Sequence, residues 1–259
     1  MEVANMLDLA SLTFALETAG CVAADDEAEE LIQKAVGDGE LERMLARRLT
    51  GEPIAWITGS TSFCGLHVAI EPGVYVPRWQ SEPLALMAAR LLPPTGVAVD
   101  LCTGAGAIAM VMQSEHPDAR IVATEIDPLA ASCARLNGLV VYEGNLDGPL
   151  PAELESKVDV ITGVLPYVPS DAMHFLPRDV QRFEPPRALD GGVGGVELIS
   201  AVVRTSPRWI KSGGWLLLEV GGDQVAEVTA MLVASGYSNI AVLEDDDGDP
   251  RGIYARLDA

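Results

Sequence analysis

The stretch Asp100-Leu101-Cys102-Thr103-Gly104-Ala105-Gly106-Ala107-Ile108 places two glycines between an apolar run and a helix-like run. Residues 97–101 have the composition of a short buried strand, and residues 105–113 have that of a helix. Glycine adopts backbone angles that other residues avoid, and it lets a ligand approach the main chain. In open parallel sheets, ligands bind beyond the carboxyl ends of the strands, where this turn would lie. The stretch therefore predicts a ligand-binding turn.

Strand-like and helix-like segments alternate from this turn onward. Further apolar runs typical of strands occupy residues 120–124, 139–142, 158–162 and 215–220. A helix-like segment, residues 128–136, lies between two of them. Such alternation predicts βαβ units and an α/β fold with a parallel, doubly wound, Rossmann-like sheet. Residues 239–243 and 253–257 flank a turn rich in glycine and aspartate, which predicts a hairpin with an antiparallel final strand at the sheet edge.

Two differently composed segments precede the alternating part. Residues 1–50 are rich in leucine, alanine and glutamate and are predicted to be helical. Residues 51–83 instead place aromatic and β-branched residues, Trp56 and Ile57 among them, between glycines and prolines, which is typical of hairpins. We therefore expect a helical domain over residues 1–50, a linking β-hairpin over 51–83 and an α/β domain over 84–259.

An acidic residue follows one strand after the glycine turn. Glu125 stands 19 residues after Gly106, near the spacing at which a carboxylate accepts hydrogen bonds from a ribose. Together with Asp100 it predicts a nucleoside-binding site; the alternative is a glycine turn that serves packing alone. Asp100 would repel the pyrophosphate of a dinucleotide, whereas S-adenosylmethionine has no phosphate and carries an amino group and a sulfonium. Electrostatics therefore favours the methyl donor over a nicotinamide cofactor.

The charge of the chain is strongly negative. Lysine and arginine number 17 and aspartate and glutamate 38, so the formal net charge is −21. DNA and RNA binding relies on clustered basic residues, and anionic membranes attract the same groups. We therefore expect no nucleic acid and no membrane as a partner. No stretch approaches the roughly 20 apolar residues that cross a bilayer.

The cysteines and histidines show no metal-binding pattern. The four cysteines are scattered, without the paired spacing of a metal site or a redox motif, and the three histidines lie in unrelated contexts. The first ten residues lack the basic start of a secretory signal. We therefore expect no bound metal, reduced cysteines and a cytoplasmic location.

Two longer motifs stand on either side of the glycine turn. They are Pro77-Arg78-x-x-Ser81-Glu82 and Glu184-Pro185-Pro186-Arg187-Ala188-Leu189-Asp190-Gly191-Gly192. With the turn itself and with Gly51-Glu52-Pro53-Ile54, they resemble the HemK-like protein-(glutamine-N5) methyltransferases, which modify peptide-chain release factors. The likeness covers nearly the whole chain, although the glycine turn is shared by many methyltransferases. It implies a seven-stranded class I methyltransferase sheet preceded by a helical substrate-recognition domain.

The resemblance also implies which residues bind the cofactor S-adenosylmethionine and the substrate. Within the cofactor site, Glu125 would bind the ribose and Asn145 the adenine, where relatives usually have an acid. The cofactor-binding positions are Asp100, Thr103, Gly104, Gly106, Glu125, Ile126, Asn145 and Leu146. The substrate-binding positions are Arg78, Glu82 and Glu184. For Arg78 and Glu82 the alternative is a tie between the hairpin and the helix that follows.

The residues after the predicted strand 158–162 depart from the family. The family has Asn-Pro-Pro-Tyr there, and this chain has Val164-Leu165-Pro166-Tyr167. The family's asparagine side chain and a proline carbonyl hold the substrate amide, whereas valine offers neither a donor nor an acceptor. The Leu165 carbonyl remains available. We therefore expect Val164, Leu165, Pro166 and Tyr167 to form the catalytic loop.

These observations together predict an S-adenosylmethionine-dependent N-methyltransferase. The expected acceptor is a side-chain nitrogen of a protein or peptide, such as a release-factor glutamine. Two alternatives stay open. One is a small-molecule amine, amide or guanidine as acceptor, and the other is a regulatory protein that binds the cofactor without catalysis. The oligomeric state does not follow from the sequence.

Overall fold

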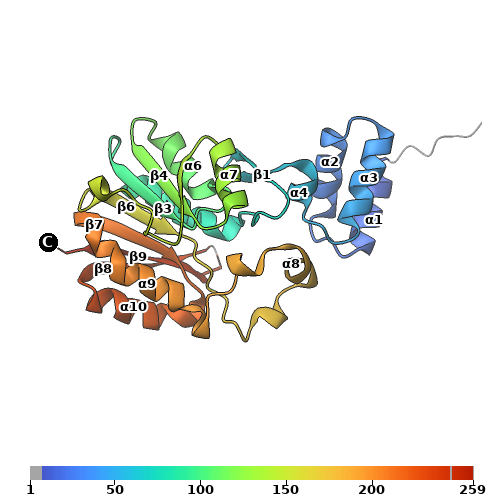
Figure 1. Ribbon diagram of the computed structural model, residues 1–259. Coiled ribbons are helices and arrows are strands. Elements are labelled where there is room, and N and C mark those ends of the chain that lie inside the picture. Colours follow the sequence, from blue (N-terminus) through green and yellow to red (C-terminus); the bar gives the residue numbers. More distant parts are fainter. Residues whose placement is uncertain (1–7, 246, 259) are drawn as a thin grey trace, which may run out of the picture.

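Three helices make up the N-terminal part of the molecule. The computed structural model describes residues 8–245 and 247–258. The helices are α1 (Leu9–Thr18), α2 (Ala24–Lys34) and α3 (Asp38–Arg48). Leucines from all three helices and Met44 fill an apolar core, because each helix turns its apolar side inward, and Ile54 and Ile57 from the segment after α3 pack against it. Figure 1 shows the unit at one end of the molecule, set apart from the sheet.

A short helix and a hairpin connect the helical unit to the sheet. Helix α4 (Ile54–Thr58) begins after Pro53 and ends at Gly59, whose φ of 82° is left-handed. The predicted hairpin is present as the antiparallel strands β1 (Ser60–Phe63) and β2 (Leu66–Ala69). The short strands therefore follow α4 directly.

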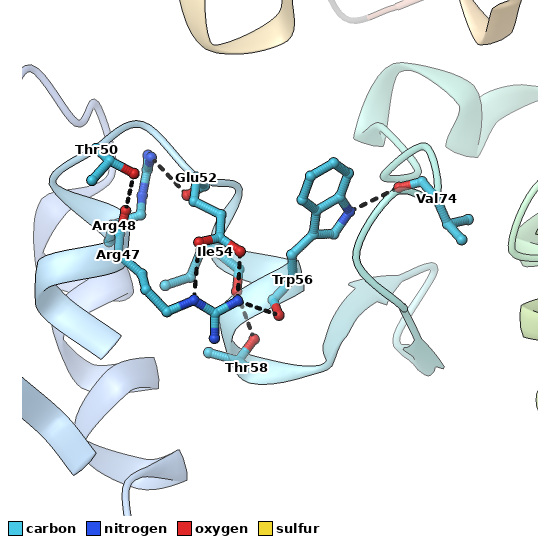
Figure 2. A network of polar contacts seen from close by, with 8 residues as sticks. All are labelled: Arg47, Arg48, Thr50, Glu52, Ile54, Trp56, Thr58 and Val74. Carbon is cyan, nitrogen blue, oxygen red and sulfur yellow. Dashed lines mark hydrogen bonds and ion pairs between the residues drawn. The ribbon is translucent and has the colours of Figure 1, made fainter. Parts of the chain in front are cut away.

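The expectation that Trp56 and Ile57 belong to the β segment is wrong, because both lie in α4. Trp56 is buried, and its indole N–H donates a hydrogen bond of 2.8 Å to the Val74 carbonyl (Figure 2). On the opposite side, the Arg47 guanidinium donates to the Trp56 carbonyl and to Glu52. These tertiary contacts override the weak β preference of aromatic and β-branched residues.

The predicted α/β sheet is confirmed, with the strand order β5-β4-β3-β6-β7-β9-β8. Its strands are β3 (Val97–Leu101), β4 (Arg120–Glu125), β5 (Val140–Glu143), β6 (Val158–Gly163), β7 (Ile210–Glu219), β8 (Tyr237–Glu244) and β9 (Pro250–Leu257). Strands β3 to β7 run parallel, and β9 is antiparallel to both of its neighbours, β7 and β8. The predicted hairpin therefore lies at the edge, with β8 outermost.

Helices cover both faces of the sheet, as Figure 1 shows. On one face lie α5 (Glu82–Leu91), α6 (Ala107–Glu115) and α7 (Pro128–Leu136), and on the other lie α9 (Glu197–Thr205) and α10 (Val225–Ala234). Ala98 and Val99, successive residues of β3, belong to the two different apolar cores, because side chains alternate along a strand. Both faces of the sheet are thus buried.

The long connection between β6 and α9 reaches back to the helical unit. It contains α8 (Arg178–Phe183), and the Arg182 guanidinium donates a hydrogen bond of 3.1 Å to the Thr50 carbonyl. Single-turn 3₁₀ helices occur at Trp79–Ser81, Ala152–Leu154, Met173–Phe175, Pro186–Ala188, Val193–Gly195, Ser206–Arg208 and Gly222–Gln224. Within the described ranges, every helix is too short or too polar to cross a bilayer.

Candidate functional site

A cavity of about 430 Å³ opens at the carboxyl ends of the parallel strands. The loops that follow β3, β4, β5 and β6 all contribute to its wall. The residues predicted from the sequence that line it are Gly104, Glu125, Ile126, Asn145, Leu146, Val164, Leu165, Pro166 and Tyr167. The structure therefore brings the predicted adenosine-binding residues and the predicted catalytic loop to one place.

A smaller cavity of about 50 Å³ adjoins the first one. Asp100 and Thr103 line this smaller cavity rather than the main one. Four residues line both cavities and so lie where the two spaces meet: Tyr75, Cys102, Gly104 and Val164. Together the two cavities extend from the Asp100 carboxylate in β3 to the predicted catalytic loop.

Glu125 joins the end of β4 to the glycine turn. One carboxylate oxygen accepts a hydrogen bond of 2.9 Å from the Gly104 N–H, and the other accepts one of 2.9 Å from the Asp127 N–H. The side chain is buried at the cavity wall. Each carboxylate oxygen can accept a second hydrogen bond, so Glu125 can take the two hydroxyl groups of a ribose.

Asp100 is almost fully buried and is held by two hydroxyl groups. Thr162 donates a hydrogen bond of 2.7 Å to one of its oxygens, and Thr103 donates to the other. Burial raises the pKa of Asp100 to about 6, and the nearby Glu125 carboxylate contributes to the rise. A positively charged ligand group beside Asp100 would stabilise its ionised form. The two carboxylates thus suit a cationic ligand without phosphates.

The two glycines of the turn have different surroundings. A Cβ at Gly104, whose φ is 58°, would meet no atom within 4 Å, so its main chain is open to a ligand. A Cβ at Gly106, whose φ is 93°, would lie 2.2 Å from the Leu139 side chain. Gly106 lines neither cavity. Its place indicates close packing of α6 against the segment that leads into β5.

The loop Val164–Tyr167 is held from behind by the segment after α8. The Val168 N–H donates to the Leu189 carbonyl at 2.9 Å, and the Gly191 N–H donates to the Val168 carbonyl at 2.8 Å. A Cβ at Gly195 would lie 2.0 Å from the Tyr167 carbonyl oxygen, so only glycine permits this approach. The motif from Glu184 to Gly192 therefore supports the loop.

Two tyrosines, Tyr75 and Tyr167, line the main cavity at the predicted catalytic loop. Burial and the nearby Glu219 carboxylate raise the pKa of Tyr167 well above its usual value. Burial raises the pKa of Tyr75 to about 12. Both phenols therefore stay protonated at neutral pH and can donate hydrogen bonds. Val164 contributes only apolar surface beside them.

The three predicted substrate-binding residues line neither cavity. Arg78 forms an ion pair with the buried Glu184, which ties the linker to the segment after α8. Burial raises the pKa of Glu184, and one of its carboxylate oxygens has no hydrogen-bond partner within the described residues. Glu82 accepts a hydrogen bond of 2.7 Å from the Cys64 N–H in the hairpin turn. The Glu82 contact ties the hairpin to α5, as the alternative expected, whereas Arg78 reaches the segment after α8 instead of that helix.

Sequence reasoning missed four cavity-lining residues with polar side chains: Tyr75, Cys102, Asp127 and Arg187. Arg187 and Asp127 form an ion pair of 3.6 Å across the cavity wall. Tyr75 stands two residues before the Pro77-Arg78 motif, and Asp127 stands two residues after Glu125. Their nearness to recognised motifs is the signal that could have identified them.

Among the described residues, no three His, Cys, Asp or Glu side chains are placed to hold a metal ion.

Comparison with curated proteins identifies many relatives. A release factor glutamine methyltransferase of Geobacter sulfurreducens is 31% identical over 220 residues, 83% of this chain and 76% of that protein. One of Moorella thermoacetica is 35% identical over 235 residues, with 88% and 82% covered. One of Vibrio cholerae is 35% identical over 221 residues, with 82% and 76% covered. No protein-family model matches the chain.

Solved structures support the fold. A methyltransferase from Pyrococcus furiosus has a TM-score of 0.56 and 19% identity, and the match covers 84% of this chain and all of that one. The 16S rRNA N2 G1207 methyltransferase of Thermus thermophilus, in complex with AdoMet and guanosine, has a TM-score of 0.52 and 17% identity. That match covers 77% of this chain and 44% of the other. At such identities the likeness concerns the sheet and its helices alone.

Proposed function

The chain belongs to the release factor glutamine methyltransferase family, and we propose that it methylates a glutamine side-chain nitrogen of a release factor. It is a methyltransferase that uses S-adenosylmethionine. The convergence of Glu125, Asn145 and the loop from Val164 to Tyr167 on one cavity carries the proposal. A cofactor-binding wall and an acceptor-binding loop are the two parts that methyl transfer needs side by side.

The residues of the cavity fit S-adenosylmethionine chemically. The volume of the main cavity, about 430 Å³, lies within the usual range of small-molecule sites. Asp100 would face the amino group of the methionyl part, and Glu125 would accept hydrogen bonds from the ribose hydroxyls. Ile126 and Leu146 would flank the adenine, and Asn145 would accept a hydrogen bond from its amino group. The open main chain at Gly104 allows close approach.

When bound, S-adenosylmethionine supplies a methyl group on a positively charged sulfur, and the carbon–sulfur bond breaks as the acceptor nitrogen forms its bond to the carbon. The chain's own residues would orient that nitrogen. An amide nitrogen is a weak nucleophile, so orientation carries much of the rate. The Leu165 carbonyl would accept one amide hydrogen, while the Tyr75 and Tyr167 side chains line the cavity beside it. The nitrogen loses its other proton to water.

Val164 removes one polar contact that an asparagine would provide. Loss of a single such contact lowers the rate by about 10²–10³-fold. We therefore expect slow glutamine methylation by this chain. The same feature supports a second candidate function, which is transfer to a more nucleophilic amine that does not need the missing hydrogen bonds.

The test is methyl transfer from labelled S-adenosylmethionine to a purified release factor and, separately, to the proteins of a cell lysate. The proposal expects label in the release factor, and no label when the accepting glutamine is replaced by alanine. Glu125→Ala serves as the control that weakens cofactor binding. Label in another lysate protein or in a small molecule, with none in the release factor, would contradict the glutamine assignment.

We further propose a division of labour along the chain. Residues 1–50 would recognise the protein substrate, 51–83 would link, and 84–259 would carry out the transfer. The ion pair between Arg78 and Glu184 supports this by fixing the linker to the loop that follows the catalytic strand. All four cysteines are free, which suits the reducing cytoplasm. Removal of residues 1–50 should abolish transfer to protein while a cofactor analogue still binds the remaining chain.

A further inference from the structure

Glu219 is a buried carboxylate that the site described above does not use. It ends β7 and is only 4% exposed, and it lines neither cavity. The Ser81 hydroxyl, from the turn before α5, donates a hydrogen bond to one of its oxygens. A buried carboxylate is costly unless its oxygens accept hydrogen bonds. The position of Glu219 therefore requires partners, and the second one is on the catalytic loop.

The group nearest to hand on that loop is the Tyr167 phenol. Leu218 is in register with Gly163 at the end of β6, so Glu219 lies beside the start of the loop from Val164 to Tyr167, and its charge acts on the Tyr167 phenol. Because the carboxylate lies beside it, the pKa of Tyr167 is raised and the proton stays on the phenol. Arg251 and Tyr75 are the other titratable groups that act on this carboxylate. Burial raises the pKa of Glu219, while Arg251 opposes the rise.

The main chain of Tyr167 is held from the same direction. Gln224, five residues after Glu219, donates from its side-chain amide to the Tyr167 carbonyl at 2.9 Å and to the Gly194 carbonyl at 3.0 Å. The oxygen of the same Gln224 side-chain amide accepts a hydrogen bond from the Gly221 N–H. Gln224 thus holds the main chain of Tyr167, while Glu219, at the end of β7, lies on the side of its phenol.

We propose that Glu219 is a positioning residue for methyl transfer: its carboxylate, fixed by Ser81, holds the Tyr167 phenol so that the ring forms one wall of the acceptor slot. Gln224 holds the backbone of the same residue. The ring matters more in this chain than it would beside an asparagine, because Val164 gives the acceptor no hydrogen bond. The expected effect of Glu219 on the methyl-transfer rate rests on the proposed function. Its expected effect on the position of the Tyr167 ring does not.

A double-mutant cycle tests the consequence for rate. Glu219→Gln keeps the size of the side chain but leaves only one oxygen to accept from both hydroxyls. We expect it to lower kcat about tenfold, since a 1 Å misplacement can cost up to about a hundredfold, with no change in KM for S-adenosylmethionine. Tyr167→Phe should have a similar effect, and the double variant should be no slower than either single variant. Multiplied effects in the double variant would overturn the proposal.

Structures of the S-adenosylhomocysteine complexes test the place of the ring without any activity. In Glu219→Ala the Tyr167 ring should shift by about 1 Å or more, while Glu219→Gln should restore most of its place. An unmoved ring in Glu219→Ala would overturn the inference even if the enzyme is active. If the wild-type protein transfers no methyl group, only the proposed function is contradicted. The position of the Tyr167 ring in the variant structures would still test the role of Glu219.

Asp159 offers a matched control. It is another buried carboxylate of the sheet, paired with Lys211 and accepting a hydrogen bond of 2.9 Å from the Val97 N–H at the opposite, amino end of the strands. Asp159→Asn should lower the midpoint of thermal unfolding but leave kcat of the folded enzyme unchanged. If it lowers kcat as Glu219→Gln does, the effect of Glu219 is one of general stability and the proposal fails.

Discussion

The Glu125 carboxylate accepts a hydrogen bond of 2.9 Å from the main-chain N–H of Gly104. This contact joins the end of β4 to the glycine turn after β3, so two adjacent strands present a single wall to the cavity. Its second oxygen accepts from the Asp127 N–H at the start of α7. In the proposed site, cofactor binding would therefore depend on a preformed turn as well as on the carboxylate itself.

Glu125→Ala should weaken S-adenosylhomocysteine binding by about 10- to 100-fold, because it removes a ribose acceptor and leaves two main-chain N–H groups without partners. Isothermal titration calorimetry measures the change. Glu153→Ala is the control, since that exposed residue only pairs with Arg120 at the surface. Equal affinities of Glu125→Ala and the wild type would contradict the role assigned to Glu125.

Gly106→Ala should destabilise the fold by about 2–4 kcal/mol, the sum of left-handed backbone strain and overpacking against Leu139. Gly104→Ala meets no neighbour and should cost only about 1–2 kcal/mol from its backbone angle. Urea unfolding of both variants gives the two free energies. A Gly106→Ala protein as stable as Gly104→Ala would show that the α6 packing is looser than the structure has it.

Cofactor affinity should fall as the pH drops below about 6. Burial raises the pKa of Asp100 to about 6, so the carboxyl becomes neutral below that pH and loses its attraction for a positively charged amino group. The dissociation constant should rise about tenfold per pH unit in that range. Titrations between pH about 5 and 8 measure it. In Asp100→Asn the affinity should be lower at neutral pH and should not change through this range; an unaltered profile would exclude Asp100 as the group responsible.

Trp56→Phe should lower the free energy of unfolding by about 1–3 kcal/mol, because the buried Val74 carbonyl loses its hydrogen-bond donor (Figure 2). Val74 lines the main cavity, so a weaker affinity for S-adenosylhomocysteine should accompany the change. Trp79→Phe is the matched control: Trp79 is 60% exposed, and its replacement should cost no more than about 0.5 kcal/mol. Equal losses in the two variants would contradict this account of α4.

Val164→Asn should raise the rate of glutamine methylation by up to about 10²–10³-fold, because it restores a donor and an acceptor at the slot. Val193→Asn, at an exposed valine outside the cavities, controls for the substitution itself. The initial rates of release-factor methylation by the wild type and the two variants measure the effect. No gain from Val164→Asn would mean that the slot has been reshaped for another acceptor.

Local patterns were sufficient to predict the sheet and much of the site. Alternation of apolar strands with helices specifies the parallel order, and the rule that ligands bind at carboxyl ends brings Gly104, Glu125 and Val164 to one cavity. Each of these residues lies at the carboxyl end of a strand or within three residues of it, so the register of the sheet places them. The antiparallel β9 was predictable because the turn before it is short and combines aspartates with Gly248.

Contacts between distant segments could not be predicted. Arg78 and Glu184 are 106 residues apart and pair with each other instead of lining a cavity. Gly106 has the spacing of a ligand-binding glycine, but only the folded chain places Leu139 against it. Trp56 lies in a helix because Val74 and Phe183 surround its ring. In each case a tertiary partner, and not local preference, determines the role.

Site-resolved mass spectrometry of a release factor, after incubation with this chain and S-adenosylmethionine, tests the central claim most directly. The account predicts the added mass of one methyl group on a single glutamine side chain, formed slowly by the wild-type protein. A methyl group on a different side chain, or none under conditions in which S-adenosylhomocysteine binds, would contradict it.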